Sequence, residues 1–358
     1  MTKHPELLPF ISGIQQIGIG VKDAHEAWDW YRKYFKMDVP IFEDAATASL
    51  MTKYTSGKAE DRYAILALNL QGGGGFEIWQ YTSITPRAAD FHITLGDLGV
   101  FAVKIRTRDI SETYRFFKSE GLDVIGTPTM CPDGRQHFYL RDPYGNMFEM
   151  VENSSWFNQN GDLTGGVAGC VIGVSDIEKA LPLYQNVLRY KFVSYDKTAV
   201  FEDFNQVSGG NDQFRRILLQ GENERKGAFS KLLCQTEIEL VEVKTREPIK
   251  IFRDRNWGDL GFIHLCFDIW GMKALSEKCT KMGFPFTVDS SNSFDMGKAA
   301  GHFSYVEDPD GTLIEFVETH KIPIIEKLGL YLNMKNRKPE KPLPKWMLKM
   351  LSLNRKKN

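Results

Sequence analysis

The stretch "GDLGFIHLCFDIWG" (258–271) decides the fold, because an earlier part of the chain repeats it. "GDLGVFAVKIRTRD" (96–109) aligns with this stretch without a gap. Two further pairs of segments match in the same order along the chain: "DPYGNMFEMVEN" (142–153) with "DPDGTLIEFVET" (308–319), and "SGIQQIGIGVKD" (12–23) with "GGVAGCVIGVSD" (165–176). Because the order is kept, residues 10–155 and 163–320 are predicted to be copies of one unit.

Each copy divides again into two similar modules. Every module opens with a short apolar strand, continues with a stretch of helical period, and closes with strand-like runs, the last of which carries a glutamate. The helical stretches are 24–35, 110–121, 177–188 and 272–283, and the glutamates are Glu77, Glu149, Glu239 and Glu315. Asp23, Asp109 and Asp176 precede the first three helical stretches, where an aspartate is typical of an N-cap. The sequence therefore predicts four βαβββ modules: 10–82, 96–155, 163–245 and 258–320.

Length and composition restrict the class of protein. A chain of 358 residues suits two domains, and 42% hydrophobic with 25% charged residues is typical of soluble globular proteins. No apolar run approaches the ~20 residues of a membrane helix, and the N-terminus lacks the apolar core of a secretory signal. The five cysteines are scattered and include no CxxC pair, which indicates reduced thiols in a cytoplasmic protein.

The net charge of −1 hides an asymmetry. Residues 321–358 carry eleven Lys or Arg and two Glu, so the remaining body is strongly acidic and a poor binder of nucleic acid. The sequence of 341–358 predicts a short cationic amphipathic helix. This tail could make peripheral membrane contact, dock on the acidic body of its own chain or of a second copy in a homodimer, or remain a solvated end.

The four modules resemble the vicinal oxygen chelate superfamily, also called glyoxalase/bleomycin-resistance/dioxygenase proteins. The resemblance covers about residues 10–320 and depends on the repeats, the V-x-D turns and the DPxG…E closing strands. It implies an α+β fold in which the modules pair into two cupped mixed β-sheets. If adjacent modules pair, 10–155 and 163–320 are two glyoxalase-like domains, each with its own cup, followed by the tail 321–358.

The resemblance also implies where metal ligands lie: on the first strand of a module, seven residues before its end, and at the closing glutamate. The first-strand positions are Gln16, Ala102, Gly169 and His264. Adjacent pairing gives the C-terminal cup the ligands Glu239, His264 and Glu315, and the N-terminal cup the candidates Gln16, Glu77 and Glu149. Since only the C-terminal cup has an imidazole, we expect one divalent transition metal there: Fe, Mn, Zn, Ni or Co. Tyr139 and Tyr305 fall where the family has a tyrosine that supports the ligands.

Two alternatives change the ligand sets. If the first module pairs with the fourth, Gln16, Glu77, His264 and Glu315 form a glyoxalase-type quartet. If instead Lys104 or Arg106, which face the same side as position 102, neutralise Glu77 and Glu149, the N-terminal half supports the catalytic half or binds an anion without metal.

The family implies a metalloenzyme that binds a small molecule. In this interpretation the ion polarises a carbonyl or enolate oxygen, and either a glutamate, for which Glu239 is preferred, or a metal-bound hydroxide removes a proton, as in an isomerase, epimerase or lyase. An Fe(II)-dependent dioxygenase is the first alternative. The segment "HFYLRDPYG" (137–145) resembles the ring-cleaving signature only in part, and Gly169 stands where a second histidine is needed. The second alternative is a metal-free binding or sequestering protein, with Trp79, Phe101 and Phe138 as pocket walls.

Overall fold

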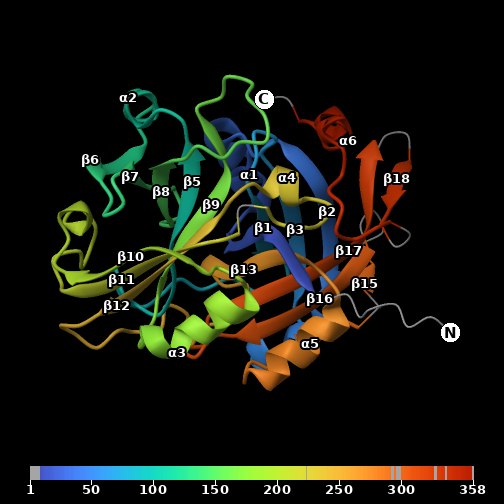
Figure 1. Ribbon diagram of the computed structural model, residues 1–358. Helices are drawn as coiled ribbons and strands as arrows, with labels where there is room; N and C mark the ends of the chain where they lie inside the picture. The colour runs from blue at the N-terminus through green and yellow to red at the C-terminus, as the bar shows by residue number, and fades with distance from the viewer. Residues whose placement is uncertain are drawn as a thin grey trace.

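Two large β-sheets form the framework of the protein (Figure 1). The computed structural model describes residues 9–222, 224–291, 294–295, 300–325, 329–334 and 337–356. Sheet A contains, in spatial order, β14 (Val288–Asp289), β16 (Ala300–Glu307), β17 (Leu313–Ile325), β13 (Gly261–Trp270), β1 (Phe10–Gly20), β4 (Gly75–Tyr81), β3 (Asp61–Leu68) and β2 (Val39–Thr47), with β15 (Phe294–Asp295) beside β16 and β18 (Leu330–Asn333) beside β17. Sheet B contains β10 (Phe192–Ala199), β11 (Phe214–Gln220), β12 (Glu237–Val243), β9 (Thr164–Gly173), β5 (Gly99–Thr107), β8 (Met147–Glu152), β7 (Gln136–Arg141) and β6 (Asp123–Met130).

The pairing of modules differs from the expected one. Sheet A joins the first module to the fourth through antiparallel β1 and β13, and sheet B joins the second to the third through antiparallel β5 and β9. The four modules do form two curled mixed sheets, as predicted. However, each sheet takes strands from both halves of the chain, so a separate cup for 10–155 and another for 163–320 do not exist. The alternative pairing of the first and fourth modules is the one that the structure adopts.

Within each half of the chain, the two modules meet through a helical segment and a turn instead of through a shared sheet. The Tyr31 hydroxyl, on the first helix, donates to the Asp142 carboxylate of the DPYG turn in the second module, at 2.6 Å. The Tyr184 hydroxyl of the third module donates in the same way to Asp308 of the DPDG turn in the fourth, at 3.0 Å. The two halves thus repeat one internal contact, in agreement with the repeat in their sequences.

Four helices follow the four opening strands, as the helical period predicts. They are α1 (Ala24–Phe35), α2 (Ile110–Ser119), α3 (Ile177–Leu181) and α5 (Met272–Lys281). The side chains of Asp23, Asp109 and Asp176 accept backbone N–H bonds at the first three, which confirms them as N-caps. Gly271 replaces the aspartate before α5, and there the Glu318 carboxylate from β17 accepts from the Met272 N–H at 2.9 Å.

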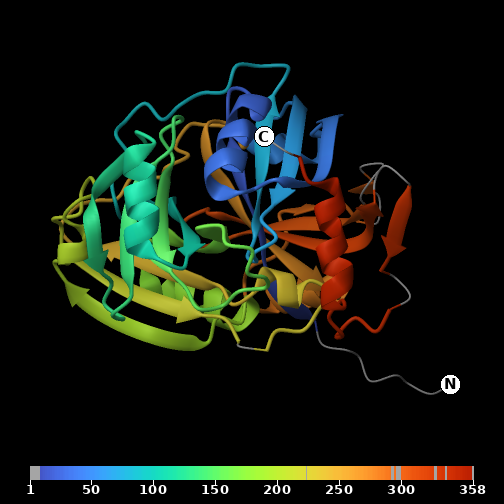
Figure 2. The same cartoon turned by 90° about the horizontal axis from the view of Figure 1, so that it is seen from above.

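One continuous core contains side chains from both sheets and from these helices. Figure 2 shows the two sheets and the helices in a second view. Side chains alternate along a strand, so one face of each sheet contributes to this core and the other face is free for a cup. On β1, for example, Ile17 and Ile19 enter the core and Gln16 points to the opposite face. Phe138, expected in a pocket wall, belongs to the core.

The C-terminal segment packs on its own chain. Helix α6 (Lys345–Met350) continues into a 3₁₀ turn, η5 (Leu351–Asn354), and both Leu348 and Leu351 are buried. Arg355 forms an ion pair with Asp38 at 3.2 Å. Docking on the chain's own body was one of the predicted alternatives. The expected start of the tail at residue 321 is wrong, because β17 continues to Ile325. Among the described helices, none is long and apolar enough to cross a membrane.

Candidate metal centre

Four polar side chains from the central strands of sheet A point into its cup. Gln16 lies on β1, Glu77 on β4, His264 on β13 and Glu315 on β17, and all four are buried. The His264 Nε2 atom is 3.1 Å from Glu315 Oε2 and 3.3 Å from Glu77 Oε2. The Gln16 side-chain amide donates to Glu77 Oε2 at 3.2 Å. The glyoxalase-type quartet that follows from pairing the first and fourth modules is therefore assembled in one place.

Three atoms of this group have no hydrogen-bond partner among the described residues: Gln16 Oε1, His264 Nε2 and Glu315 Oε2. Nε2 is close to two carboxylates, but none of these contacts has hydrogen-bond geometry. Buried polar atoms without partners are costly and need an explanation. Because ligand atoms of Glu77, His264 and Glu315 lie within 4.8 Å of one another, these residues fit a divalent metal with oxygen and imidazole ligands.

The electrostatics of the imidazole favour a cation in the cup. Burial alone would lower the pKa of His264, but the carboxylates of Glu315 and Glu77 outweigh burial and raise that pKa to about 9. Without a metal, the protonated ring therefore supplies the positive charge between the two glutamates at neutral pH. A metal ion must replace this proton in order to bind.

Neighbouring residues fix the orientation of the imidazole. The Tyr305 hydroxyl lies 3.4 Å from His264 Nδ1, and the Trp257 indole is stacked with the ring at an interplanar angle of 15°. Opposite His264 on β1 stands Gly18, where an added Cβ would come within 2.4 Å of the ring. Tyr305 therefore occupies the supporting position that the sequence predicted. Trp257 precedes the repeated stretch and carried no signal in the sequence.

A cavity of about 320 Å³ opens beside these ligands. Its walls include both glutamates together with Trp79, Trp257 and Tyr305. Arg62 also lines it and forms an ion pair with Asp44 at 3.1 Å. Trp79, predicted as a pocket wall, is thus in that position, and the cavity gives a small molecule access to the carboxylates.

Glu239 does not join this group, because it lies on β12 of sheet B. The expected ligand set of Glu239, His264 and Glu315 must therefore be corrected: Glu77 takes the place of Glu239. The reason is the pairing of modules, which brings the first module and not the third beside the fourth. Glu149, grouped with Gln16 and Glu77 in the sequence, likewise lies in sheet B, on β8.

The equivalent place in sheet B holds a lysine. Its four equivalent positions are Ala102, Glu149, Gly169 and Glu239. Lys104 Nζ lies 2.9 Å from a carboxylate oxygen of both Glu149 and Glu239. Burial disfavours the charged lysine, but the neighbouring glutamates raise its pKa well above the usual range. The predicted neutralisation of Glu149 by Lys104 is confirmed; that of Glu77 is wrong, and Arg106 instead donates to backbone carbonyls.

Further charges close the network in sheet B. Arg216 pairs with Glu239 at 2.7 Å and with both oxygens of Asp203 at 2.7 and 2.9 Å. His137 Nδ1 lies 2.9 Å from Glu149. Although burial opposes ionisation, Arg216 and Lys104 lower the pKa of Glu239 to about 2. Every carboxylate in this network therefore already has a cationic partner.

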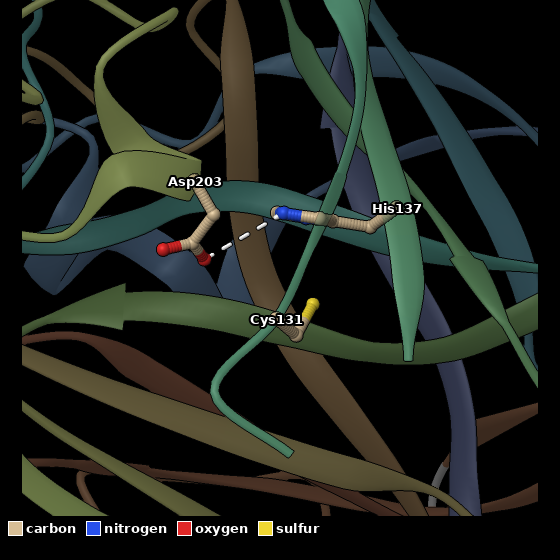
Figure 3. Close-up of side chains that lie close together, drawn as sticks. All are labelled: Cys131, His137 and Asp203. Atoms are coloured by element: carbon tan, nitrogen blue, oxygen red, sulfur yellow. Dashed lines mark ion pairs between the residues drawn. The ribbon is translucent and has the colours of Figure 1, made fainter. Parts of the chain in front are cut away.

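Figure 3 shows the remaining cluster of potential ligands in sheet B, Cys131, His137 and Asp203, whose donor atoms lie within 4.8 Å of one another. The His137–Asp203 contact is long, at 3.6 Å, and Arg216 holds both oxygens of Asp203. Burial and the charge of Glu149 raise the pKa of Cys131 well above its usual value, so the thiol stays protonated. These residues fit a metal poorly. The Phe204 ring, 3.5 Å from the Arg216 guanidinium carbon, fills the same cup.

The two remaining predicted residues also lie in the cup of sheet B. Phe101 and Tyr139 pack with Phe204 in one apolar cluster. Tyr139 occupies the place that Tyr305 has in sheet A, one strand from the closing glutamate. Its hydroxyl is buried and has no hydrogen-bond partner among the described residues. The Tyr139 hydroxyl therefore lacks a contact like the one between Tyr305 and His264.

Comparison with known proteins agrees with this architecture. Residues 13–150 match the family model of the Glyoxalase/Bleomycin resistance protein/Dioxygenase superfamily. A "putative dioxygenase" from Bacillus subtilis superposes with a TM-score of 0.56 at 13% identity over 86% of both chains, and glyoxalase I from Zea mays with a TM-score of 0.53 at 12% identity over 86% of this chain and 92% of that one. No curated protein matches the sequence. The family match thus covers the first two modules, and the fold of the described residues is the glyoxalase/dioxygenase-like fold.

Proposed function

We propose that the cup of sheet A binds one divalent transition metal through Gln16, Glu77, His264 and Glu315. We further propose that the protein is an enzyme that isomerises, epimerises or eliminates from a small carbonyl compound. The observation that carries this proposal is the convergence of the four side chains in a buried site, where three of their polar atoms have no hydrogen-bond partner among the described residues. The fold alone does not specify a reaction.

A bound divalent ion would act as a Lewis acid that polarises a carbonyl or enolate oxygen. The chain itself must then supply a base. Glu315 is our choice, because its Oε2 atom has no hydrogen-bond partner, whereas Glu77 Oε2 accepts from the Gln16 amide. A carboxylate whose oxygen is free of a hydrogen-bond donor is the better proton acceptor. Glu239, the base expected from the sequence, does not fit this role, because it lies in sheet B and forms ion pairs with Lys104 and Arg216.

The aromatic walls of the cavity favour proton transfer because they exclude water and orient the imidazole. Trp79 and Trp257 are almost fully buried and pack edge to face, with ring centroids 4.2 Å apart. Such walls keep water from the reacting carbon and strengthen electrostatic interactions. Tyr305 holds the imidazole in place from its Nδ1 side. The residues thus supply orientation, water exclusion and a base in one pocket.

The ligand set favours this chemistry over ring cleavage. The group has one imidazole, two carboxylates and an amide, whereas the dioxygenases that the sequence partly resembles need two histidines. The similar structures include both a glyoxalase I and a protein described as a dioxygenase, so the fold does not discriminate between these reactions. The argument for non-redox chemistry is therefore the ligand set, which contains one histidine instead of two.

The test combines metal analysis with isotope exchange. Protein loaded with Mn, Fe, Co, Ni or Zn should retain one equivalent of metal after dialysis. In D₂O it should exchange the α-hydrogen of small 2-hydroxy ketones or 2-hydroxy aldehydes, followed by NMR. Glu315→Gln should abolish exchange, and the matched control Glu149→Gln in sheet B should keep both metal and exchange. Absence of stoichiometric metal would instead indicate a binding protein, and oxygen consumption by the Fe(II) form would indicate a dioxygenase.

A further inference from the structure

A second cavity, of about 100 Å³, adjoins the candidate metal centre and differs in most of its lining residues from the Trp79 cavity. Gln16, Glu77 and Glu315 line it, and the two glutamates also line the 320 Å³ cavity. The carboxylates therefore stand at the junction of two compartments. A molecule with an atom at this junction could extend into both.

Apart from those ligands, the walls of the second compartment are largely apolar. Its remaining lining residues on the strands include Leu66 and Leu68 of β3 and Val317 of β17. Side chains two apart on a strand share a face, so Leu66 and Leu68 continue the face that β3 turns toward the site, and Val317 continues that of Glu315. The cup of sheet A thus changes from polar at the ligands to apolar beyond them.

Two segments from outside sheet A cover this apolar compartment. One is α4 (Ser230–Leu233), which belongs to the third module and contributes Leu232 and Leu233. Close approach of α4 requires Gly13 on β1, where an added Cβ would lie 2.9 Å from the Leu233 side chain. The other is η5, whose Leu351 is 2% exposed and lines the compartment. The C-terminal tail is therefore a wall of the site.

We propose that the ligand of this cup is amphipathic, with a chelating oxygen-bearing head at the metal and a hydrocarbon tail against Leu351 and α4. This inference rests on the proposed metal centre and specifies the substrate class for it. A short polar substrate would leave the leucine-lined compartment empty. An alkyl tail would gain the free energy of burying apolar surface there. Leu351 acts as a specificity-determining residue in this arrangement.

The experiment uses a homologous series of n-alkyl hydroxamates, from acetohydroxamate to octanohydroxamate, as chelating probes for the full-length, metal-loaded protein. Isothermal titration calorimetry should show the dissociation constant falling about fourfold with each added methylene, until the compartment is filled. Leu351→Trp should remove this dependence on chain length and leave the affinity for acetohydroxamate unchanged. The matched control is Leu353→Trp, two residues further on, where the side chain is 57% exposed and the series should behave as in the wild type.

The possible results separate the two proposals. Failure to take up metal, or to bind acetohydroxamate, would overturn the proposed metal centre and this inference with it. Tight binding of acetohydroxamate with no gain along the series would overturn the amphipathic ligand alone. The same holds if Leu351→Trp binds octanohydroxamate as tightly as the Leu353→Trp control does. Unchanged acetohydroxamate affinity in both variants shows that each is folded around an intact metal centre.

Discussion

The two cups are built from equivalent strands, yet they neutralise a pair of buried carboxylates in different ways. Each has two buried glutamates from closing strands: Glu77 and Glu315 in sheet A, Glu149 and Glu239 in sheet B. Sheet B supplies a permanent cation in Lys104. Sheet A supplies an imidazole that can lose its proton, beside an accessible cavity. The difference indicates that a pair of buried carboxylates is not by itself enough to predict a metal site. Metal binding also depends on whether the chain already neutralises the two carboxylates with a side chain that keeps its positive charge, as Lys104 does.

The largest effect is expected from removal of that permanent cation. Lys104→Met would leave Glu149 and Glu239 facing each other with reduced compensation. Breaking such a buried pair costs about 3–5 kcal/mol in the free energy of unfolding, measured by urea denaturation. The triple variant, with both glutamates also changed to Gln, should recover most of this loss. A Lys104→Met protein as stable as the wild type would show that sheet B does not depend on its ion pairs.

The protonated imidazole should make the stability of the metal-free protein depend on pH. The folded pKa of His264 is about 9, above its ordinary value near 6.5. The folded state therefore binds the proton more tightly, and this stabilisation is complete below about pH 6.5 and lost as pH rises through 9. Chemical denaturation should show a decrease on the order of 3 kcal/mol over this range relative to His264→Gln. Parallel curves for the two proteins would contradict the assignment.

Removal of the buried histidine should lower metal affinity in sheet A, whereas removal of the buried histidine in sheet B should not. His264→Ala removes the imidazole from the candidate centre, and we expect metal affinity to fall at least about a hundredfold. His137→Ala removes the buried strand histidine of the other cup and should leave metal affinity within about threefold of the wild type. Competition with a chromogenic chelator measures both. Equal losses in the two variants would mean that the metal binds elsewhere or that the cups are equivalent.

The smallest effect concerns the tyrosines at equivalent places in the two sheets. Tyr305→Phe removes the hydroxyl that lies 3.4 Å from His264 Nδ1, and loss of such a supporting contact costs about tenfold in metal affinity. Tyr139→Phe, the matched change in sheet B, should have no effect on metal binding. The chelator competition assay applies again. If the two variants bind metal equally well, Tyr305 does not orient the imidazole.

Local features were predictable from the sequence because they depend on neighbouring residues. The aspartates at 23, 109 and 176 cap helices, since a carboxylate on the residue directly before a helix accepts from free N–H groups of its first turn wherever the module lies. The cap of α5 could not be predicted, because Glu318 reaches Met272 from another strand. Likewise, Lys104 was recognised as facing its cup from strand alternation alone, but its second partner, Glu239, comes from the third module.

The sequence by itself determined four βαβββ modules, the residue at which each module's helix begins, and the position of a glutamate or a first-strand residue on the inner face of each. These follow from periodicity and from the repeat. Only the tertiary structure decided which modules share a sheet, and hence that Glu77 and not Glu239 accompanies His264. The opening strands are alike in their hydrogen-bonding edges, so backbone pairing does not discriminate among partners. Side chains that meet only after folding, such as Tyr31 with Asp142 and Tyr184 with Asp308, join the two modules of each half without a shared sheet.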